Sequence, residues 1–226
     1  MTRELKLNFM ERFPLFAVLR PEEKEQLSQY MEFRKIPRYH TIYKSGEDSD
    51  KLFFLVKGSI KIAIQADEGK EVIKSLIHPL ALFGEKGLVG QRYRQDYAQA
   101  LKEEVQYFSV KVEDFKRLMY QNFDLSSQVM AIFGNRLITA EHKLESLICK
   151  DARTRIIEFI KDAVNKRGQR IGYELLLRHS LTHQDIANIT HTSRQTVTLV
   201  LNELKKSNLI YFNRGKILVR DLAKLA

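Results

Sequence analysis

Between about Glu32 and Val112 the apolar residues come in short runs that are separated by glycine-bearing turns. Runs of this length at roughly regular spacing are typical of an antiparallel sandwich or barrel. The segment 13–33 before them and the segment that opens at Val112 have helical patterns instead. The sequence therefore predicts an all-β unit that is flanked by helices. Its strands are expected at 41–43, 52–56, 60–64, 72–77 and 107–110.

A long helix without proline is predicted from about Leu125 to Ile148. Apolar residues repeat along it at alternating spacings of three and four, which is the a/d pattern of a coiled coil. A single amphipathic helix packed on its own domain would give a similar stripe. Because this stripe is narrow and the helix lies between two domains, we expect a parallel dimer whose seam is formed by Met130, Phe133, Leu137, Ala140, Leu144 and Leu147.

Two helix starts lie ten residues apart in the last part of the chain. Thr182 with Asp185 predicts an N-cap, and Thr192 with Gln195 fits a capping box. They mark two short helices with a tight turn between them, at 182–189 and 193–204.

The second of these helices has two different faces. Its apolar residues recur at spacings of four and three, and they are Val197, Leu201 and Leu204. Polar side chains cluster at the N-terminal end of the opposite face, as in a helix that enters the major groove of DNA, and they are Arg194, Gln195 and Thr198. Two further runs, 209–212 and 216–219, predict a hairpin, or wing, with a basic turn at Asn213-Arg214-Gly215.

The charge of the chain is concentrated in the same region. Residues 149–226 carry 15 lysines and arginines against 7 aspartates and glutamates, a net charge of +8, whereas the preceding residues carry 23 against 21, a net charge of +2. Such asymmetry is typical of a nucleic-acid-binding module, although a basic solvated surface gives the same count. The capped helices, the hairpin and the charge together predict DNA binding.

Several classes of protein are not expected. The single Cys149 cannot form an internal disulfide or hold an iron–sulfur cluster by itself, and it fits a reducing compartment. No run approaches the about 18 apolar residues of a membrane span, and the first residues lack the apolar stretch of a signal peptide, so we expect a cytoplasmic protein. No nucleophile motif, phosphate-binding loop or paired metal-ligand spacing occurs, so we expect neither an enzyme nor a metal site.

Four short motifs carry a family resemblance: Gly58-Ser59-Ile60-Lys61-Ile62, Phe83-Gly84-Glu85 followed by Arg94, Asp151-x-x-x-Arg155-Ile156, and Ser193-Arg194-Gln195-Thr196-Val197. With them the chain resembles, over nearly its whole length, the bacterial transcription factors of the cyclic-AMP receptor protein and fumarate-nitrate regulator (Crp/Fnr) family. The resemblance implies an α+β fold with an N-terminal antiparallel β-roll of the jelly-roll, cyclic-nucleotide-binding-like type, a long dimerisation helix and a C-terminal winged helix-turn-helix. It places these parts at residues 1–122, 123–150 and 151–226, and it implies a homodimer that binds a palindromic operator in double-stranded DNA and contacts RNA polymerase.

The same resemblance assigns roles on the second short helix. Arg194 is expected against a guanine, where its guanidinium meets O6 and N7. Gln195 and Thr198 take the other reading positions, and Leu199 stands where several members have an arginine. His191 stands where the turn commonly has glycine, and histidine tolerates a positive φ better than most residues. The expected DNA-binding residues are Thr182, Ser193, Arg194, Gln195, Thr196, Thr198 and Arg214.

In the nucleotide-binding members of the family, a Gly-Glu turn and an arginine hold the phosphate and ribose of the effector. Gly84, Glu85 and Arg94 match those positions. If residues 92–97 form a strand, Asp96 shares the face of Arg94 and repels a phosphate there, and two helix positions near adenine lack hydroxyl groups. We therefore expect either an Arg94–Asp96 contact that closes an empty pocket, or an effector pocket that does not take cyclic AMP and is formed by Phe83, Gly84, Glu85, Arg94, Asp96, Ala140 and Glu141.

Other effectors stay open at this point. Haem needs only one or two axial ligands, and no pattern selects one of the candidates, which are His40, His78, His142, Met10 and Cys149. One alternative is a regulator of the same architecture that responds to a cyclic nucleotide or to haem and nitric oxide. Another is a cyclic-nucleotide-binding module without DNA binding. The favoured interpretation is a DNA-binding regulator with an effector other than cyclic AMP, or with none.

Overall fold

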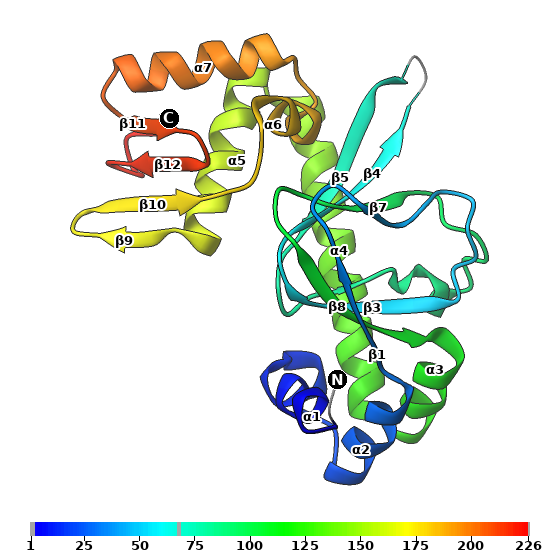
Figure 1. Ribbon diagram of the computed structural model, residues 1–226. Helices are drawn as coiled ribbons and strands as arrows, with labels where there is room; N and C mark the ends of the chain where they lie inside the picture. The colour runs from blue at the N-terminus through cyan, green and yellow to red at the C-terminus, as the bar shows by residue number, and fades with distance from the viewer. Residues whose placement is uncertain (1–2, 67–68, 226) are drawn as a thin grey trace. The chain divides into compact units, whose positions relative to one another are not determined.

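The computed structural model of the chain describes residues 3–66 and 69–225, and the chain divides into two compact units (Figure 1). The first unit contains residues 1–67 and 74–139, and the second contains residues 68–73 and 140–226. The longest helix, α4 (Phe123–Cys149), begins in the first unit and ends in the second. Within the described ranges, no helix is long and apolar enough to cross a membrane.

The first unit is built on two four-stranded sheets. Their strand orders are β1-β8-β3-β6 and β2-β7-β4-β5, and pairs such as β3–β8 and β4–β7 are antiparallel. The predicted antiparallel β-roll is thereby confirmed. The strands are β1 (Glu32–Ile36), β2 (Thr41–Tyr43), β3 (Lys51–Lys57), β4 (Ile60–Gln65), β5 (Glu71–Ile77), β6 (Leu82–Phe83), β7 (Tyr97–Ala100) and β8 (Val105–Lys111).

Strand β3 shows why this sequence builds two layers. Successive side chains of a strand point to opposite faces of the sheet. Leu52 and Phe54 therefore enter one buried apolar cluster, while Phe53 and Leu55 enter another. Each of these side chains is almost fully withdrawn from water, which stabilises the fold by about 1.5–3 kcal/mol per large apolar side chain.

Short helices before β1 and after β8 complete the first of these clusters, and they are α1 (Arg3–Arg12), the 3-10 turn η1 (Pro14–Phe16), α2 (Pro21–Tyr30) and α3 (Val112–Gln121). Helix α1 is not among the predicted elements, because charged residues surround the two that it buries, Phe9 and Met10. Met10 is fully buried in this cluster.

Helix α4 confirms the predicted long helix, and its first half presents one face to the core of the first unit. Leu125 and Val129 are buried, and Phe133 is partly buried against the same cluster, because residues four apart lie on one face of a helix. Phe133, a member of the predicted seam, therefore packs partly on the core of its own chain. Met130 and Leu137 are exposed, and further along the helix Ala140, Leu144 and Leu147 are exposed as well.

The second unit combines three helices with a four-stranded sheet of order β11-β12-β10-β9. Its elements are α5 (Ala152–Arg167), β9 (Gln169–Ile171), β10 (Glu174–Arg178), α6 (His183–Thr190), α7 (Arg194–Lys206), β11 (Ile210–Asn213) and β12 (Lys216–Val219). Asp151 caps α5 by accepting a hydrogen bond from the Thr154 amide. Arg155 donates to the carbonyl oxygens of Lys150, Thr190 and His191 at 2.7, 3.0 and 3.2 Å. These contacts fix the end of α6 and explain the Asp-x-x-x-Arg motif structurally.

Candidate nucleic-acid interface

Helices α6 and α7 form a helix-turn-helix whose ends are fixed by side-chain caps. Thr182 and Asp185 form a reciprocal capping box at the start of α6, as predicted. His191 ends α6 with φ of +51°. The cap of α7 is Ser193, whose Oγ accepts a hydrogen bond from the Thr196 amide at 3.0 Å. The predicted Thr192–Gln195 capping box is therefore wrong, because α7 begins one residue later than that box requires.

The two faces of α7 are as different as the sequence predicts. The face that packs on the second unit is buried and consists of Val197, Val200, Leu201 and Leu204. Arg194 and Gln195 are exposed at the N-terminal end of the helix, next to the cap. This end offers a guanidinium and an amide, the groups that can form paired hydrogen bonds with guanine and adenine in the major groove.

Thr198, the third predicted reading residue, uses its hydroxyl group inside the protein. Its Oγ1 donates to the Arg194 carbonyl oxygen at 2.9 Å, and it lies 3.0 Å from Nδ1 of His183. Since that hydroxyl proton is already used, His183 Nδ1 is the donor of the second bond. His183 is not among the predicted site residues, although its place directly after the cap of α6 is a signal that could have identified it.

His183 is held in place from two sides. Its ring lies 5.8 Å from the ring of Phe212 on β11. Burial lowers the pKa of His183, and the positive charge of Arg194 lowers it further. The imidazole is therefore neutral near pH 7.

Strands β11 and β12 form the predicted wing. They pair in register from Ile210 with Val219 to Asn213 with Lys216. Arg214 is exposed in the turn between them. Lys205, near the end of α7, lies 5.3 and 5.4 Å from the ring centres of Tyr211 and Phe212, which holds the wing against the helix through cation–π contacts. The predicted DNA-binding residues thus lie at the start of α6, on the first turns of α7 and at the tip of the wing.

A buried charged cluster occupies the β-roll at the predicted effector site. Its three central residues, Glu85, Arg94 and Asp96, are only 2, 5 and 4% exposed. Gly84 precedes it with φ of +73°, and a Cβ atom there would lie 2.7 Å from the Phe53 ring and 2.8 Å from Arg94 Nη1. Glycine is therefore required at this turn.

Arg94 is bound by the backbone. Its Nη1 donates to the carbonyl oxygen of Gly84 at 2.8 Å, and its Nη2 donates to that of Lys51 at 2.5 Å. The guanidinium also lies 4.4 Å from the ring centre of Tyr43. The expected Arg94–Asp96 contact is absent from the hydrogen bonds and ion pairs of the described residues. The condition under which Asp96 would share a strand face with Arg94 is not met, since β7 begins only at Tyr97.

Asp96 is neutralised by two lysines instead. Lys86 Nζ lies 2.8 Å and Lys74 Nζ 3.3 Å from Asp96 Oδ2, and the Tyr43 hydroxyl donates to Oδ1 at 3.4 Å. Burial alone would raise the pKa of Asp96, but the hydrogen bonds and charges of the two lysines outweigh it and lower the pKa below its usual range. Burial raises the pKa of Tyr43, and Asp96 adds to that shift.

Glu85 is paired with Arg136 of α4, which also donates to the Leu82 carbonyl oxygen at 2.5 Å. Three members of this cluster are not among the predicted site residues: Lys74, Lys86 and Arg136. Lys74 could have been identified because it lies within the apolar run of β5. Of the other predicted pocket residues, Phe83 is buried in the core, whereas Ala140 and Glu141 are exposed further along α4.

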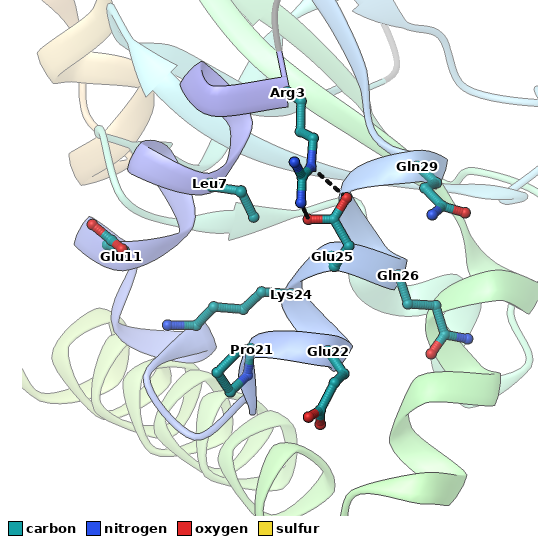
Figure 2. Close-up of a pocket in the computed structure, with 9 residues that line it drawn as sticks. All are labelled: Arg3, Leu7, Glu11, Pro21, Glu22, Lys24, Glu25, Gln26 and Gln29. Carbon is teal, nitrogen blue, oxygen red and sulfur yellow. Dashed lines mark hydrogen bonds and ion pairs between the residues drawn. The ribbon is translucent and has the colours of Figure 1, made fainter.

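A separate groove of about 630 Å³ lies between α1 and α2 (Figure 2). A two-pronged ion pair between Arg3 and Glu25, with both bonds at 2.6 Å, crosses it. None of the predicted site residues lines it. Within the part of the chain that the structure describes, no group of three or more His, Cys, Asp or Glu residues is arranged to hold a metal ion.

Comparisons with known proteins match two different parts of the chain to two domain models. Residues 33–122 match the cyclic nucleotide-binding domain model, and residues 154–226 match the Crp-like helix-turn-helix domain model. The CRP-like cAMP-activated global transcriptional regulator of Mycobacterium tuberculosis is 25% identical over 96% of this chain and 96% of its own length. The global nitrogen regulator of Synechocystis is 27% identical over 94% of each chain. The solved structure of FixK2 from Bradyrhizobium japonicum superposes with a TM-score of 0.77 at 17% identity, over 86% of this chain and 95% of that one.

The helix-turn-helix and these matches define a DNA-binding transcription regulator that carries a domain of the cyclic nucleotide-binding type. Its relatives are regulators of transcription, and the chain is not an enzyme. The chain belongs to the Crp/Fnr family.

Proposed function

We propose that the chain acts as a homodimer, binds a two-fold symmetric DNA operator through α7, and does so without cyclic AMP. The observation that carries this proposal is the outward face of α7, where Arg194 and Gln195 are exposed directly beside the helix cap. A helix terminus of this kind can enter the major groove while the wing contacts the backbone. The two half-sites then lie about one helical turn of DNA apart, or a multiple of it.

The exposed stripe of α4 supports the homodimer. Met130, Leu137, Leu144 and Leu147 leave large apolar side chains in water on a single described chain. Covering them with the same stripe of a second copy removes this apolar surface from water. We propose residues 1–122 as the sensor domain, 123–150 as the dimerisation helix and 151–226 as the DNA-binding domain.

The buried charged cluster supports an effector other than cyclic AMP, or none. Arg94, which a phosphate would need, already binds two carbonyl oxygens, and Asp96 is neutralised by Lys74 and Lys86. A cyclic nucleotide would have to compete with all of these contacts. Cyclic AMP as the effector is the second candidate, because a relative is named as cAMP-activated and because Arg94 Nε is buried without a hydrogen-bond partner among the described residues.

The cytoplasm is the proposed compartment, since the DNA target lies there and the single Cys149 is unpaired. RNA polymerase is a further proposed partner, because the relatives are regulators of transcription.

The test is selection from a pool of random duplexes with the purified full chain, with and without cyclic AMP, followed by sequencing. We expect a palindrome to be enriched in both arms. A variant with both Arg194 and Gln195 replaced by alanine serves as the control and should retain only sequence-independent binding. Enrichment only with cyclic AMP would overturn the proposal for the effector, and no enrichment in either arm would count against an unliganded DNA-binding form.

A further inference from the structure

Leu199 is the exposed member of the large apolar side chains of α7. Within this fully described helix, Val197, Val200, Leu201 and Leu204 are buried, whereas Leu199 is 63% exposed. A single exposed leucine is ordinary on a protein surface. The position of Leu199 on the helix, however, points to a role in DNA binding.

Leu199 lies on the face that the proposed function sends into the major groove. A helix turns by about 100° per residue, so Leu199 neighbours Gln195 one turn earlier and points away from Val197 and Leu201. The four residues from Gln195 to Leu199 advance about 6 Å along the helix. Leu199 is therefore within reach of a base pair close to the one that Gln195 meets.

The neighbouring side chain makes this part of the reading face still more apolar. The Thr198 hydroxyl donates to the Arg194 carbonyl oxygen at 2.9 Å and lies 3.0 Å from His183 Nδ1. Its proton is therefore not free for a base. Beyond Arg194 and Gln195, the face thus presents the side chain of Leu199 beside a threonine whose polar group is already used.

The major groove has one apolar feature that such a surface can recognise. Adenine, guanine and cytosine present hydrogen-bonding groups there, whereas thymine also presents its 5-methyl group. A leucine pressed against a polar base edge would leave that edge without a partner. We infer that Leu199 packs on the 5-methyl group of a thymine in each half-site of the operator, an inference that rests on the proposed function.

The test removes only that methyl group. In the duplex enriched by the selection, each thymine of the half-site is replaced in turn by deoxyuridine, symmetrically in both half-sites, and the affinity of the full chain is measured. At one position we expect binding to weaken about fifteenfold, or about fourfold per half-site, which is the transfer value of one buried methyl group. At that position, placing 5-methylcytosine rather than cytosine should restore part of the binding.

Three variants identify the residue responsible. With Leu199→Ala the thymine-to-uracil ratio should fall close to one at that position, whereas Leu199→Met, which keeps an apolar side chain, should retain most of it. Ile171→Ala removes a similarly exposed aliphatic side chain from β9 of the same unit and should leave the ratio unchanged.

Insensitivity of the wild-type protein to every thymine-to-uracil change, or an enriched half-site without thymine, would overturn the inference while the proposed DNA binding stands. A ratio that persists in Leu199→Ala would also overturn it and assign the methyl contact to another residue. If no sequence is enriched with or without cyclic AMP, both the proposed function and this inference fail.

Discussion

Because two lysines neutralise Asp96, we expect removal of the lysines and removal of the carboxylate to lower the unfolding free energy by different amounts. Asp96 is buried, whereas the side chains of Lys74 and Lys86 are 37 and 42% exposed. Replacing both lysines by methionine leaves a carboxylate that water cannot reach. Replacing Asp96 by asparagine instead leaves two ammonium groups that can turn toward water. The lysine double variant should therefore lose much more stability than Asp96→Asn.

The distances set the size of the difference. Lys86 Nζ and Lys74 Nζ lie 2.8 and 3.3 Å from Asp96 Oδ2. At an effective dielectric constant of about 20, these distances give Coulomb energies of about 6 and about 5 kcal/mol before desolvation is subtracted. Because both lysines are partly exposed, solvent screens most of this attraction. We expect the double variant to lose about 3 kcal/mol of unfolding free energy and Asp96→Asn about 1 kcal/mol or less.

The assay is urea unfolding followed by circular dichroism, at pH values from 7 to 3. The lysines hold the pKa of Asp96 below its usual value, so the stabilisation is present above about pH 4 and is lost as the pH falls through the lowered pKa. The difference between wild type and Asp96→Asn should therefore be constant from pH 7 to 5 and shrink below about pH 4. The reasoning is refuted if Asp96→Asn is as destabilising as the double variant, or if Lys86→Met costs as much in the Asp96→Asn background as in wild type.

Three further predictions concern the second unit, one of them with a matched control variant. Arg194→Ala should weaken binding to the selected duplex by about 1–3 kcal/mol and binding to a scrambled duplex much less; equal losses in a mobility-shift titration would contradict a base-reading role. Arg155→Met leaves three carbonyl oxygens without their donor and should lower the unfolding free energy, measured with urea, by about 2 kcal/mol. The control Arg153→Met removes an exposed ion pair with Glu203 and should lower it by about 0.5 kcal/mol or less. His191→Gly relieves a positive φ and should raise the unfolding free energy by about 0.5 kcal/mol. Because burial and nearby positive charges lower the pKa of His191, the wild type should also lose more stability than the glycine variant as the pH falls below about 6.5. Parallel profiles of unfolding free energy against pH for the two proteins would refute this.

The elements that the sequence predicts correctly are those whose signals are local. The β-roll follows from short apolar runs and glycine turns, and the helix-turn-helix follows from caps and a four-and-three spacing. The capping error on α7 shows the limit of such signals. Thr192 and Ser193 are both good cap residues, and the burial of Val197 and Leu201 against the second unit decides between them.

The strand considered for residues 92–97 does not form, and the reason is different. The alternating charges of this segment look like a strand, and the expected burial of Arg94 together with Asp96 is observed. The backbone, however, pairs only briefly with a turn: the Arg94 amide donates to the Glu47 carbonyl oxygen at 2.8 Å, and the Gly46 amide donates to the Arg94 carbonyl oxygen at 2.8 Å. Two buried charged side chains can thus share one environment without the regular alternation of a strand.

The charge balance of the effector site could not be read from the motif, because its counterions come from elsewhere in the chain. Asp96 was expected to oppose an anionic ligand by repulsion, yet Lys74 and Lys86 lie 22 and 10 residues before it in sequence and surround its carboxylate. With Arg94 and Arg136 included, four cations lie among three carboxylates, Glu85, Asp96 and, near Arg94, Asp50. Repulsion is therefore not what keeps an anion out of this cluster. An incoming anion must displace Asp96 from its lysines and two carbonyl oxygens from Arg94, so the barrier to an effector is the set of contacts that the protein already makes with itself.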